Sequence, residues 1–391
     1  MKKKKIAILG STGSIGKSTL EIIKEDKSFN VYILCANKNF KQICKQIKIF
    51  RPKIVIITND LTYIKVKDKF KSQRIIFYNN FNYLKKVEKK VDFTICAIPG
   101  IAGLEPTIKF ISISKVLLLA NKESIICGWK LINKASKKYR VKLVPIDSEH
   151  FSIQQLINKY KFSDIDKIFI TASGGPFLNL PKKDFSKITP RLALNHPKWK
   201  MGKKISIDSA TLVNKVLEVS EALKIFPFDL NFYKIIIHPQ SLVHAIIQLK
   251  NGTKLFLYHD TDMKIPISNA LESNYELLKK KKNKTYKIKN LNFIEVDKKK
   301  FPIVDLIPKI NSEKSSLIVF NAANEIFVDQ FLNNNIDFTD ITRYLKLLVN
   351  SKKYIILSKM NNGNLDKIKK IDFLSRKLAL SILNLKSKND Y

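Results

Sequence analysis

The chain has 391 residues, enough for two or three domains with their own cores, and its hydrophobic content of 45% is that of an ordinary globular protein. No apolar run approaches the ~20 residues of a membrane-spanning helix, and the first apolar run is too short for a signal peptide. We therefore expect a cytoplasmic protein without a targeting segment. The four cysteines have no metal-finger spacing, which is typical of buried thiols in a reducing compartment.

The formal net charge of +39 would ordinarily indicate a partner such as nucleic acid or an anionic membrane. Only six of the 72 basic residues are arginines, the side chain that reads guanine in two hydrogen bonds. The lysines are scattered through every segment. We interpret them as a solvated surface that attracts phosphorylated small molecules, and we expect no specific nucleic-acid or membrane partner.

The first third of the chain alternates short apolar runs with helical stretches. This pattern predicts an α/β fold with a doubly wound, Rossmann-like parallel sheet that binds ligands beyond the carboxyl ends of its strands. The predicted strands cover residues 6–9, 31–36, 53–58, 74–78, 92–98, 116–120 and 141–146, and the predicted helices cover 16–26, 39–50, 80–90, 103–110 and 124–139.

Beyond this region the residue composition changes twice along the chain. Residues 147–278 carry dense polar clusters and glycine-containing loops, typical of a central α+β domain. Residues 279–309 form a lysine-rich connecting segment, and the helical spacing of apolar residues over 310–391 predicts a C-terminal helical domain.

The stretch GSTGSIGKS, residues 10–18, follows the first predicted strand and leads into a helix. A glycine-rich turn before a helix N-terminus offers free backbone N–H groups to a phosphate. Gly10 and Gly16 enclose five residues, where a nucleoside-triphosphate loop has four. The glycines stand at the first, fourth and seventh places, where a dinucleotide turn has them at the first, third and sixth. The local pattern leaves a dinucleotide, another phosphate ligand and a structural turn open.

The second predicted strand ends in Asn37, Lys38 and Asn39, without the acidic residue that an NAD site usually places there. A cation at this point suits the extra phosphate of NADP, although Lys38 is also compatible with an ordinary surface lysine.

In VPIDSEH, Asp147 and Glu149 stand two residues apart at the end of an apolar run. If the run continues as a strand, both carboxylates share one face and would repel unless a cation lies between them. Oxygen ligands favour Mg²⁺ or Mn²⁺. The alternative is a helix N-terminus with Asp147 or Ser148 as its cap.

Three further stretches contain candidate binding residues. DSATLVNKVLE predicts one helix with Ser209 at its start, and Asn214 and Glu218 would share a face, with Lys215 next to Asn214. An amphipathic structural helix is the alternative. TASGGPF predicts a strand end with Ser173 before a tight Gly-Gly turn, and NHPKWKMGKK predicts a loop with His196, Trp199 and Met201 that is either a lid or a buried anchor.

Together these stretches resemble the 1-deoxy-D-xylulose 5-phosphate reductoisomerases, NADPH-dependent enzymes of the non-mevalonate isoprenoid pathway. The resemblance extends from residue 10 to about residue 325, and it favours a dinucleotide at the first loop. Its motifs are GSTGSIG, LANKES, PIDSEH, SGGPF, HPKWKMGKKISIDSATLVNK, IHPQS and NAANE.

The resemblance implies a role for each matching position. Residues 1–146 would bind NADPH, residues 147–278 would carry metal and substrate, and the protein would be a homodimer. The implied cofactor residues are Thr12, Gly13, Ser14, Ile15, Asn37, Lys38, Asn39, Asn121, Glu123 and Gly202. The implied metal ligands are Asp147, Glu149 and Glu218, and Lys122 and His196 would join them in catalysis. The implied substrate residues are Lys122, Ser148, Glu149, Ser173, His196, Ser209, Asn214, Lys215 and Glu218, beneath a flap with Trp199 and Met201.

The chain departs from the family pattern at three places. Glycine is usual where it has Asn37 and Val216, and YHDTDM at residues 258–263 replaces a Gly-Glu-Pro-Asp-Met run. Asparagine tolerates a positive φ, whereas the β-branched Val216 would crowd its helix face. We expect His259 to Thr261 to alter how the flap packs.

Two alternatives have a different chemistry. Another NADP-linked oxidoreductase, such as a semialdehyde dehydrogenase, would need a nucleophilic cysteine in its second domain, but all four cysteines precede residue 128. A basic nucleic-acid-binding protein would interleave arginine with aromatic residues on one stripe.

Overall fold

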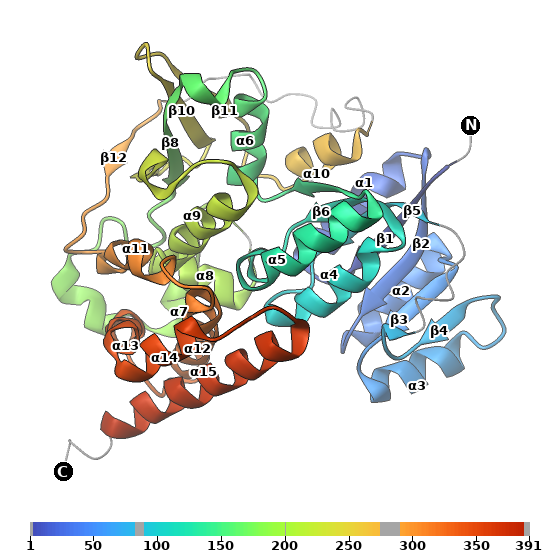
Figure 1. Cartoon of the computed structure of the whole chain (residues 1–391). Helices are drawn as coiled ribbons and strands as arrows, with labels where there is room; N and C mark the ends of the chain where they lie inside the picture. Colours follow the sequence, from blue (N-terminus) through green and yellow to red (C-terminus); the bar gives the residue numbers. More distant parts are fainter. Residues whose placement is uncertain (1–2, 83–89, 200, 274–289, 387–391) are drawn as a thin grey trace. The chain divides into compact units, whose positions relative to one another are not determined.

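The computed structural model describes residues 3–82, 90–199, 201–273 and 290–386 (Figure 1). The chain divides into two compact units. Unit 1 contains Met1–Ile125, Trp129–Phe151 and Asp262–Ile288, and unit 2 contains Ile126–Gly128, Ser152–Thr261 and Lys289–Tyr391. Within the described ranges, no helix has both the length and the apolar composition needed to cross a membrane.

Unit 1 contains a seven-stranded parallel sheet with the order β4-β3-β2-β1-β5-β6-β7. The strand order reverses between β1 and β5, so the loop that leaves β1 lies at the switch point where such sheets bind ligands. The predicted fold class is therefore confirmed. The strands are β1 Lys4–Leu9, β2 Phe29–Ala36, β3 Ile54–Ile57, β4 Ile76–Tyr78, β5 Val91–Cys96, β6 Ser114–Leu119 and β7 Lys142–Pro145.

Both faces of the sheet are covered, which explains its continuous apolar runs. In β1, the neighbouring residues Ile6 and Ala7 point to opposite faces of the sheet, and both are fully buried. The helices that follow the strands are α1 Ser14–Glu25, α2 Phe40–Phe50, α3 Asp60–Lys69, α4 Leu104–Ile111 and α5 Lys122–Tyr139. Residues Lys264–Leu271 form α10, whose Ile267 and Leu271 join the same core as α1.

Two helix predictions differ from the structure. The sequence analysis missed α3 because its large apolar residues do not form a buried face: Leu61 is 71% exposed and Ile64 is 60% exposed. Asn59 caps this helix by accepting a hydrogen bond from the Thr62 N–H at 3.0 Å. The helix predicted at 80–90 falls mainly on residues 83–89, which lie outside the described residues.

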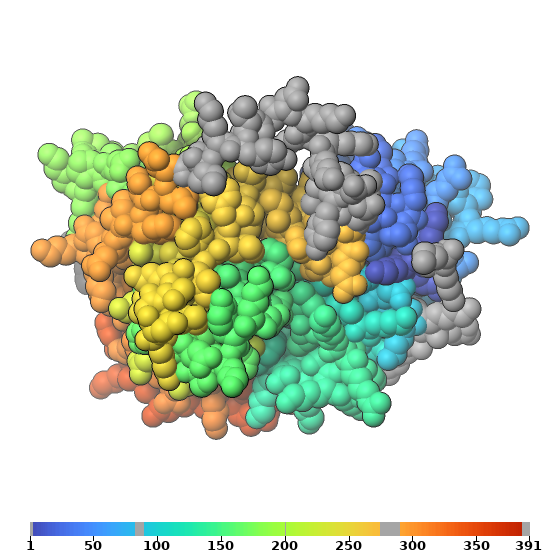
Figure 2. All heavy atoms as spheres, turned by 90° about the horizontal axis from the view of Figure 1, so that it is seen from above, coloured from blue at the N-terminus to red at the C-terminus, as the bar shows by residue number. Residues whose placement is uncertain are grey.

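Unit 2 contains a five-stranded sheet with the order β11-β10-β8-β9-β12. Only β8 and β9 pair in parallel, and the other neighbours are antiparallel. Figure 2 shows the β10–β11 hairpin, in yellow, at the surface of the molecule. The strands are β8 Ile165–Ala172, β9 Tyr233–Ile237, β10 Val243–Leu249, β11 Lys254–Tyr258 and β12 Ile294–Glu295.

The helices of unit 2 belong to two groups. The first group is α6 Ser148–Ile157, which begins in unit 1, with α7 Pro190–Ala193, α8 Lys203–Ala210 and α9 Val213–Ile225. The second group, in orange and red in Figure 1, is α11 Ile307–Ile310, α12 Ser316–Leu332, α13 Phe338–Asn350, α14 Lys352–Lys359 and α15 Leu365–Lys386. Fully buried Phe320 and Phe327 on α12 lie in its core, so the predicted helical C-terminal region is confirmed.

Candidate active site

The glycine-rich loop after β1 forms a tight turn in unit 1. Gly10 has a φ of +81°, and its carbonyl accepts a hydrogen bond from the Gly13 N–H at 3.0 Å. A Cβ atom on the buried Gly16 would lie 2.5 Å from the Gly10 oxygen, so only glycine allows α1 to begin this close to the strand. Helix α1 has no acidic residue in its first turn, and Gly13 and Ser14 are exposed. This end can therefore accept an anion.

The residues after β2 lie at the start of α2. Asn39 caps the helix by accepting a hydrogen bond from the Gln42 N–H at 3.1 Å, and Asn37 donates to the Thr58 hydroxyl at 2.7 Å. The φ of Asn37 is not positive, so the left-handed tolerance that the sequence analysis invoked is not needed there. Lys38 is exposed, and its cation is free to meet a phosphate.

Asn121 occupies the N-cap of α5 and uses its whole side chain structurally. Its oxygen accepts from the Ser124 N–H at 2.5 Å, while its amide donates to the carbonyl oxygens of Gly100, at 2.9 Å, and Ile98. This arrangement joins the loop after β5 to the helix that begins with Lys122 and Glu123, both buried.

Asp147 and Glu149 lie at a helix start and not on a strand. Strand β7 ends at Pro145 and α6 begins at Ser148, so the shared strand face that the sequence analysis proposed is wrong and its helix-cap alternative is confirmed. The Asp147 carboxylate accepts a hydrogen bond from the Glu149 N–H at 3.1 Å. Ser148 donates its hydroxyl proton to Glu149 at 2.6 Å.

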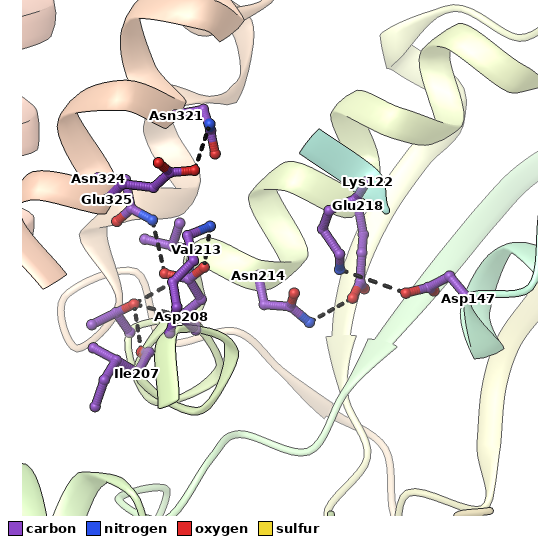
Figure 3. A network of polar contacts seen from close by, with 12 residues as sticks. Lys122, Asp147, Ile207, Asp208, Val213, Asn214, Glu218, Asn321, Asn324 and Glu325 are labelled. Atoms are coloured by element: carbon purple, nitrogen blue, oxygen red, sulfur yellow. Dashed lines mark hydrogen bonds and ion pairs between the residues drawn. The ribbon is translucent and has the colours of Figure 1, made fainter. Parts of the chain in front are cut away.

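The Asp147 carboxylate is compensated by neighbouring cations and donors in unit 1. The Lys122 side chain points toward Asp147 in Figure 3. Its Nζ lies 3.5 Å from Asp147 Oδ2, and His150 Nδ1 lies 3.2 Å from Oδ1. Burial raises the pKa of Asp147, but the Lys122 charge and the His150 hydrogen bond outweigh it and hold that pKa well below its usual range. Asp147 is therefore ionised at neutral pH, as a metal ligand must be.

In unit 2, Ser173 and His196 meet directly. Ser173 follows β8 and precedes Gly174 and Gly175, whose φ angles of +80° and +68° confirm the predicted tight turn. The Ser173 hydroxyl lies 3.0 Å from His196 Nε2 and accepts from the Gly175 N–H at 3.1 Å.

The tautomer of His196 follows from its neighbours. Its Nδ1 accepts backbone N–H groups from Lys198, at 3.2 Å, and Trp199, at 3.0 Å, so the ring proton is on Nε2 and is donated to Ser173. Burial, followed by the positive charge of Lys215, lowers the pKa of His196 to about 4. The imidazole is therefore neutral at pH 7 and acts as a hydrogen-bond donor through Nε2.

The DSATLVNKVLE stretch forms two helices where the sequence analysis expected one. Leu212 has a φ of +62° and separates α8 from α9. Ser209 consequently lies in the last turn of α8, which ends at Ala210, and not at a helix start.

Helix α9 carries the predicted polar group in one buried cluster. Asn214 donates to Glu218 Oε1 at 2.5 Å (Figure 3), and Lys215 Nζ lies 2.6 Å from Glu218 Oε2. All three side chains are less than a tenth exposed. The Lys215 ammonium therefore compensates the buried Glu218 carboxylate.

The loop between α7 and α8 holds Trp199, Met201 and Gly202. Trp199 is half-buried, and its ring packs edge-to-face on His244 with a centroid distance of 5.9 Å. Gly202 is exposed at the N-cap of α8.

Two buried polar features were missed by sequence reasoning. Asn324 on α12 donates to Asp208 at 2.8 Å (Figure 3). Lys204 Nζ lies 2.9 Å from the other Asp208 oxygen. His259 stacks on His244 in unit 2. The NAANE motif and the YHDTDM departure were the available signals, but neither indicates a spatial partner.

Three family models match the chain. One described as 1-deoxy-D-xylulose 5-phosphate reductoisomerase matches residues 6–128, and its C-terminal-domain model matches 143–226. A further model, DXP reductoisomerase C-terminal domain, matches 259–378.

Full-length relatives and solved structures agree with these models. The 1-deoxy-D-xylulose 5-phosphate reductoisomerase of Pelagibacter ubique (strain HTCC1062) is 44% identical over 383 residues, which are 96% of this chain and 99% of the relative. That of Wolbachia pipientis subsp. Culex pipiens (strain wPip) is 40% identical over 390 residues, or 98% of each chain.

Among solved structures, a DOX-P reductoisomerase in complex with NADPH, fosmidomycin and magnesium is 31% identical, with a TM-score of 0.89 over 98% of this chain and 99% of that one. The reductoisomerase from Zymomonas mobilis in complex with NADPH is 30% identical, with a TM-score of 0.83 over the same shares. This chain belongs to the 1-deoxy-D-xylulose 5-phosphate reductoisomerase family.

Proposed function

We propose that the protein converts 1-deoxy-D-xylulose 5-phosphate into 2-C-methyl-D-erythritol 4-phosphate, with NADPH and a divalent metal ion, in isoprenoid precursor biosynthesis. The observation that carries this proposal is the similarity to reductoisomerases over almost the whole chain, 44% identical in one case. It favours this reaction over another NADP-linked oxidation or nucleic-acid binding, the two alternatives left open by the sequence.

The donor set fits a hard divalent cation. Asp147, Glu149 and Glu218 offer only carboxylate oxygens, which suit Mg²⁺ or Mn²⁺. The low pKa of Asp147 keeps this carboxylate ionised, and so ready to act as a ligand, without the metal. A bound ion would polarise the substrate ketone and stabilise the negative charge that develops on its oxygen.

The loop from Gly10 to Gly16 fits the pyrophosphate of NADPH, which would supply the hydride. Thr12, Gly13, Ser14 and Ile15 would surround it. Asn37, Lys38 and Asn39 would meet the 2′-phosphate, because the exposed lysine adds a cation and no acid follows β2. Asn121 and Glu123, with Gly202, would complete this site. Since the Asn121 side chain already holds the loop after β5, its contribution would be positioning or backbone contact.

The substrate phosphate would accept hydrogen bonds from hydroxyl and amide side chains and would contact one lysine ammonium group. Ser173, Ser209, Asn214 and Lys215 are the proposed residues. His196 supports this assignment because its neutral ring donates a proton toward Ser173 and leaves that hydroxyl proton available to a ligand. Lys122 and Ser148 would contact the reacting end of the substrate, and Trp199 and Met201 would cover it as part of the flap.

We also propose a cytoplasmic homodimer, with NADPH binding in residues 1–146, catalysis in 147–278, a connection over 279–309 and a helical domain over 310–391. The family resemblance supports this division and the dimer. Size-exclusion chromatography with light scattering would measure the dimer directly.

The reaction is tested by NADPH oxidation with 1-deoxy-D-xylulose 5-phosphate and Mg²⁺ or Mn²⁺. We expect turnover that EDTA abolishes and that collapses in Glu149→Gln. Glu105→Gln is the matched control, because Glu105 lies on α4, pairs with Lys109 at 2.7 Å at a partly exposed position, and is not a proposed site residue. Turnover that survives EDTA, or no turnover from folded wild-type protein with either metal, would contradict the proposal.

A further inference from the structure

Three aromatic side chains of unit 2, Trp199, His244 and His259, form a contiguous cluster that includes one of the departures from the family pattern. We infer that His259 is a positioning residue for the proposed reaction: its ring stacks on His244 and holds that imidazole where it packs edge-to-face against Trp199. The role rests on the proposed function, since Trp199 belongs to the loop assigned to the flap.

Strand pairing brings the two imidazoles to one side of the sheet. Val243 pairs with Tyr258, and the His259 N–H donates to the Leu242 carbonyl at 2.9 Å, directly after β11. Leu242 and His244 are two residues apart, which places them on the same face of a strand, diagonal to His259. The register shifts between Val243 and Ile246, and such a bulge redirects the side chains beside it.

The imidazole rings of His244 and His259 pack face to face in the interior of unit 2. The ring centroids of His244 and His259 lie 4.0 Å apart with an interplanar angle of 16°, and both residues are buried, at 2% and 8% exposure. His259 Nδ1 donates to the Asp260 carbonyl at 2.9 Å, which fixes the ring orientation. Burial lowers the pKa of His259, so the ring that stacks is the neutral one.

His244 also contacts Trp199, with a ring-centroid distance of 5.9 Å and an interplanar angle of 67°. The Trp199 N–H donates to His196 Nδ1, so the same residue is attached by its ring to the stack and by its backbone to a proposed substrate residue. Removing His259 takes away the ring that covers His244 and so weakens the packing of the Trp199 ring against it. The loop then binds substrate less well, while the carboxylates that perform the chemistry are untouched.

The experiment uses the only two tryptophans of the chain. In full-length protein carrying Trp129→Phe, Trp199 is the sole indole, and its emission and acrylamide quenching report its packing without substrate. His259→Gly should shift the emission to the red and increase quenching. An edge-to-face contact corresponds to about a 2- to 12-fold change in an equilibrium, so KM should rise about 2- to 12-fold with kcat nearly unchanged.

Two further variants separate positioning from a general structural effect. His259→Phe keeps a flat ring on His244 and should restore both the emission and KM. Phe293→Ala removes a ring that stacks on His238, with the ring centroids 4.8 Å apart, beside β9 and β12 of the same sheet, and should leave both quantities unchanged.

Unchanged Trp199 emission in His259→Gly would overturn the inference, as would a loss of kcat without a change in KM. An emission shift of the same size in Phe293→Ala would also overturn it. Failure of the proposed function is distinguishable, because wild-type protein would then be inactive while the fluorescence comparison still reports the stack.

Discussion

The first loop contains two glycines that should respond to alanine in different ways. At Gly16, the added Cβ would lie 2.5 Å from the Gly10 oxygen and 2.5 Å from the Ser11 Cα. Both contacts are backbone, so we take the upper end of the ~1–3 kcal/mol that overpacking costs. Helix propensity returns about 1 kcal/mol of this. The net loss of unfolding free energy for unit 1 is about 2 kcal/mol.

At Gly13, the Cβ would lie 3.4 Å from the same oxygen, an ordinary contact. The backbone there, with φ of −77° and ψ of 178°, is open to alanine, and losing glycine at an N-cap costs about 0.5 kcal/mol. Because Gly13 is exposed on the side proposed for the cofactor, the same methyl group should clash with NADPH. A clash of ~1–3 kcal/mol raises the dissociation constant for NADPH about 5- to 150-fold.

Urea unfolding of unit 1, followed by Trp129 emission in a Trp199→Phe background, measures the first quantity. With a slope of ~2 kcal/mol per molar urea, Gly16→Ala should lower the midpoint by about 1 M and Gly13→Ala by roughly 0.25 M. Titration with NADPH measures the second quantity. The reasoning is refuted if Gly13→Ala unfolds as early as Gly16→Ala, or if Gly13→Ala binds NADPH as tightly as the wild type.

Three other predictions concern buried polar groups and thiols. Asn324→Leu removes the donor to buried Asp208 and should cost unit 2 about 1–3 kcal/mol in urea unfolding followed by Trp199 emission; an unchanged midpoint would contradict this. His196 has its pKa lowered from 6.5 to about 4 by burial and by a nearby positive charge, so below pH 6.5 the unfolded state takes up a proton that the folded state refuses. Unit 2 should therefore lose stability between pH 6.5 and 4, and His196→Gln should lose less over this window; parallel losses would exclude the effect. Cys35 and Cys96 are buried thiols whose pKa burial raises to about 12, so iodoacetamide should label them only after unfolding, and labelling of the native protein would be the contrary result.

Local pattern was sufficient for much of the fold. Strands buried on both faces appear as continuous apolar runs, which is why β1 Lys4–Leu9 and β5 Val91–Cys96 were predicted within two residues of their observed ends. The turn at Gly174 was also predictable, because a Gly-Gly pair after an apolar run favours positive φ angles. Helix α3 was not predictable by the same rule, since two of its apolar residues, Leu61 and Ile64, are exposed.

The sequence indicated which residues belong to the candidate site, but not the local backbone conformation that positions them. Motif spacing indicated Asp147 and Glu149 as metal ligands but left a strand end and a helix cap both open, because DSEH is compatible with either, and the structure has the helix start. Because Leu212 adopts a left-handed conformation, Ser209 lies at a helix end and not at the predicted helix start. No sequence pattern predicts this conformation for a leucine.

Contacts between distant segments were decided only by the tertiary structure. The stack of His259 on His244 requires a hairpin register and a bulge, and the bond from Asn324 to Asp208 joins residues 116 positions apart. The sequence pattern predicts the secondary structure and the buried face of each segment, because periodicity depends only on residues close in the sequence. Which buried polar groups find each other depends on packing between elements, and it is this packing that sets the orientation of His196, Asp208 and Trp199.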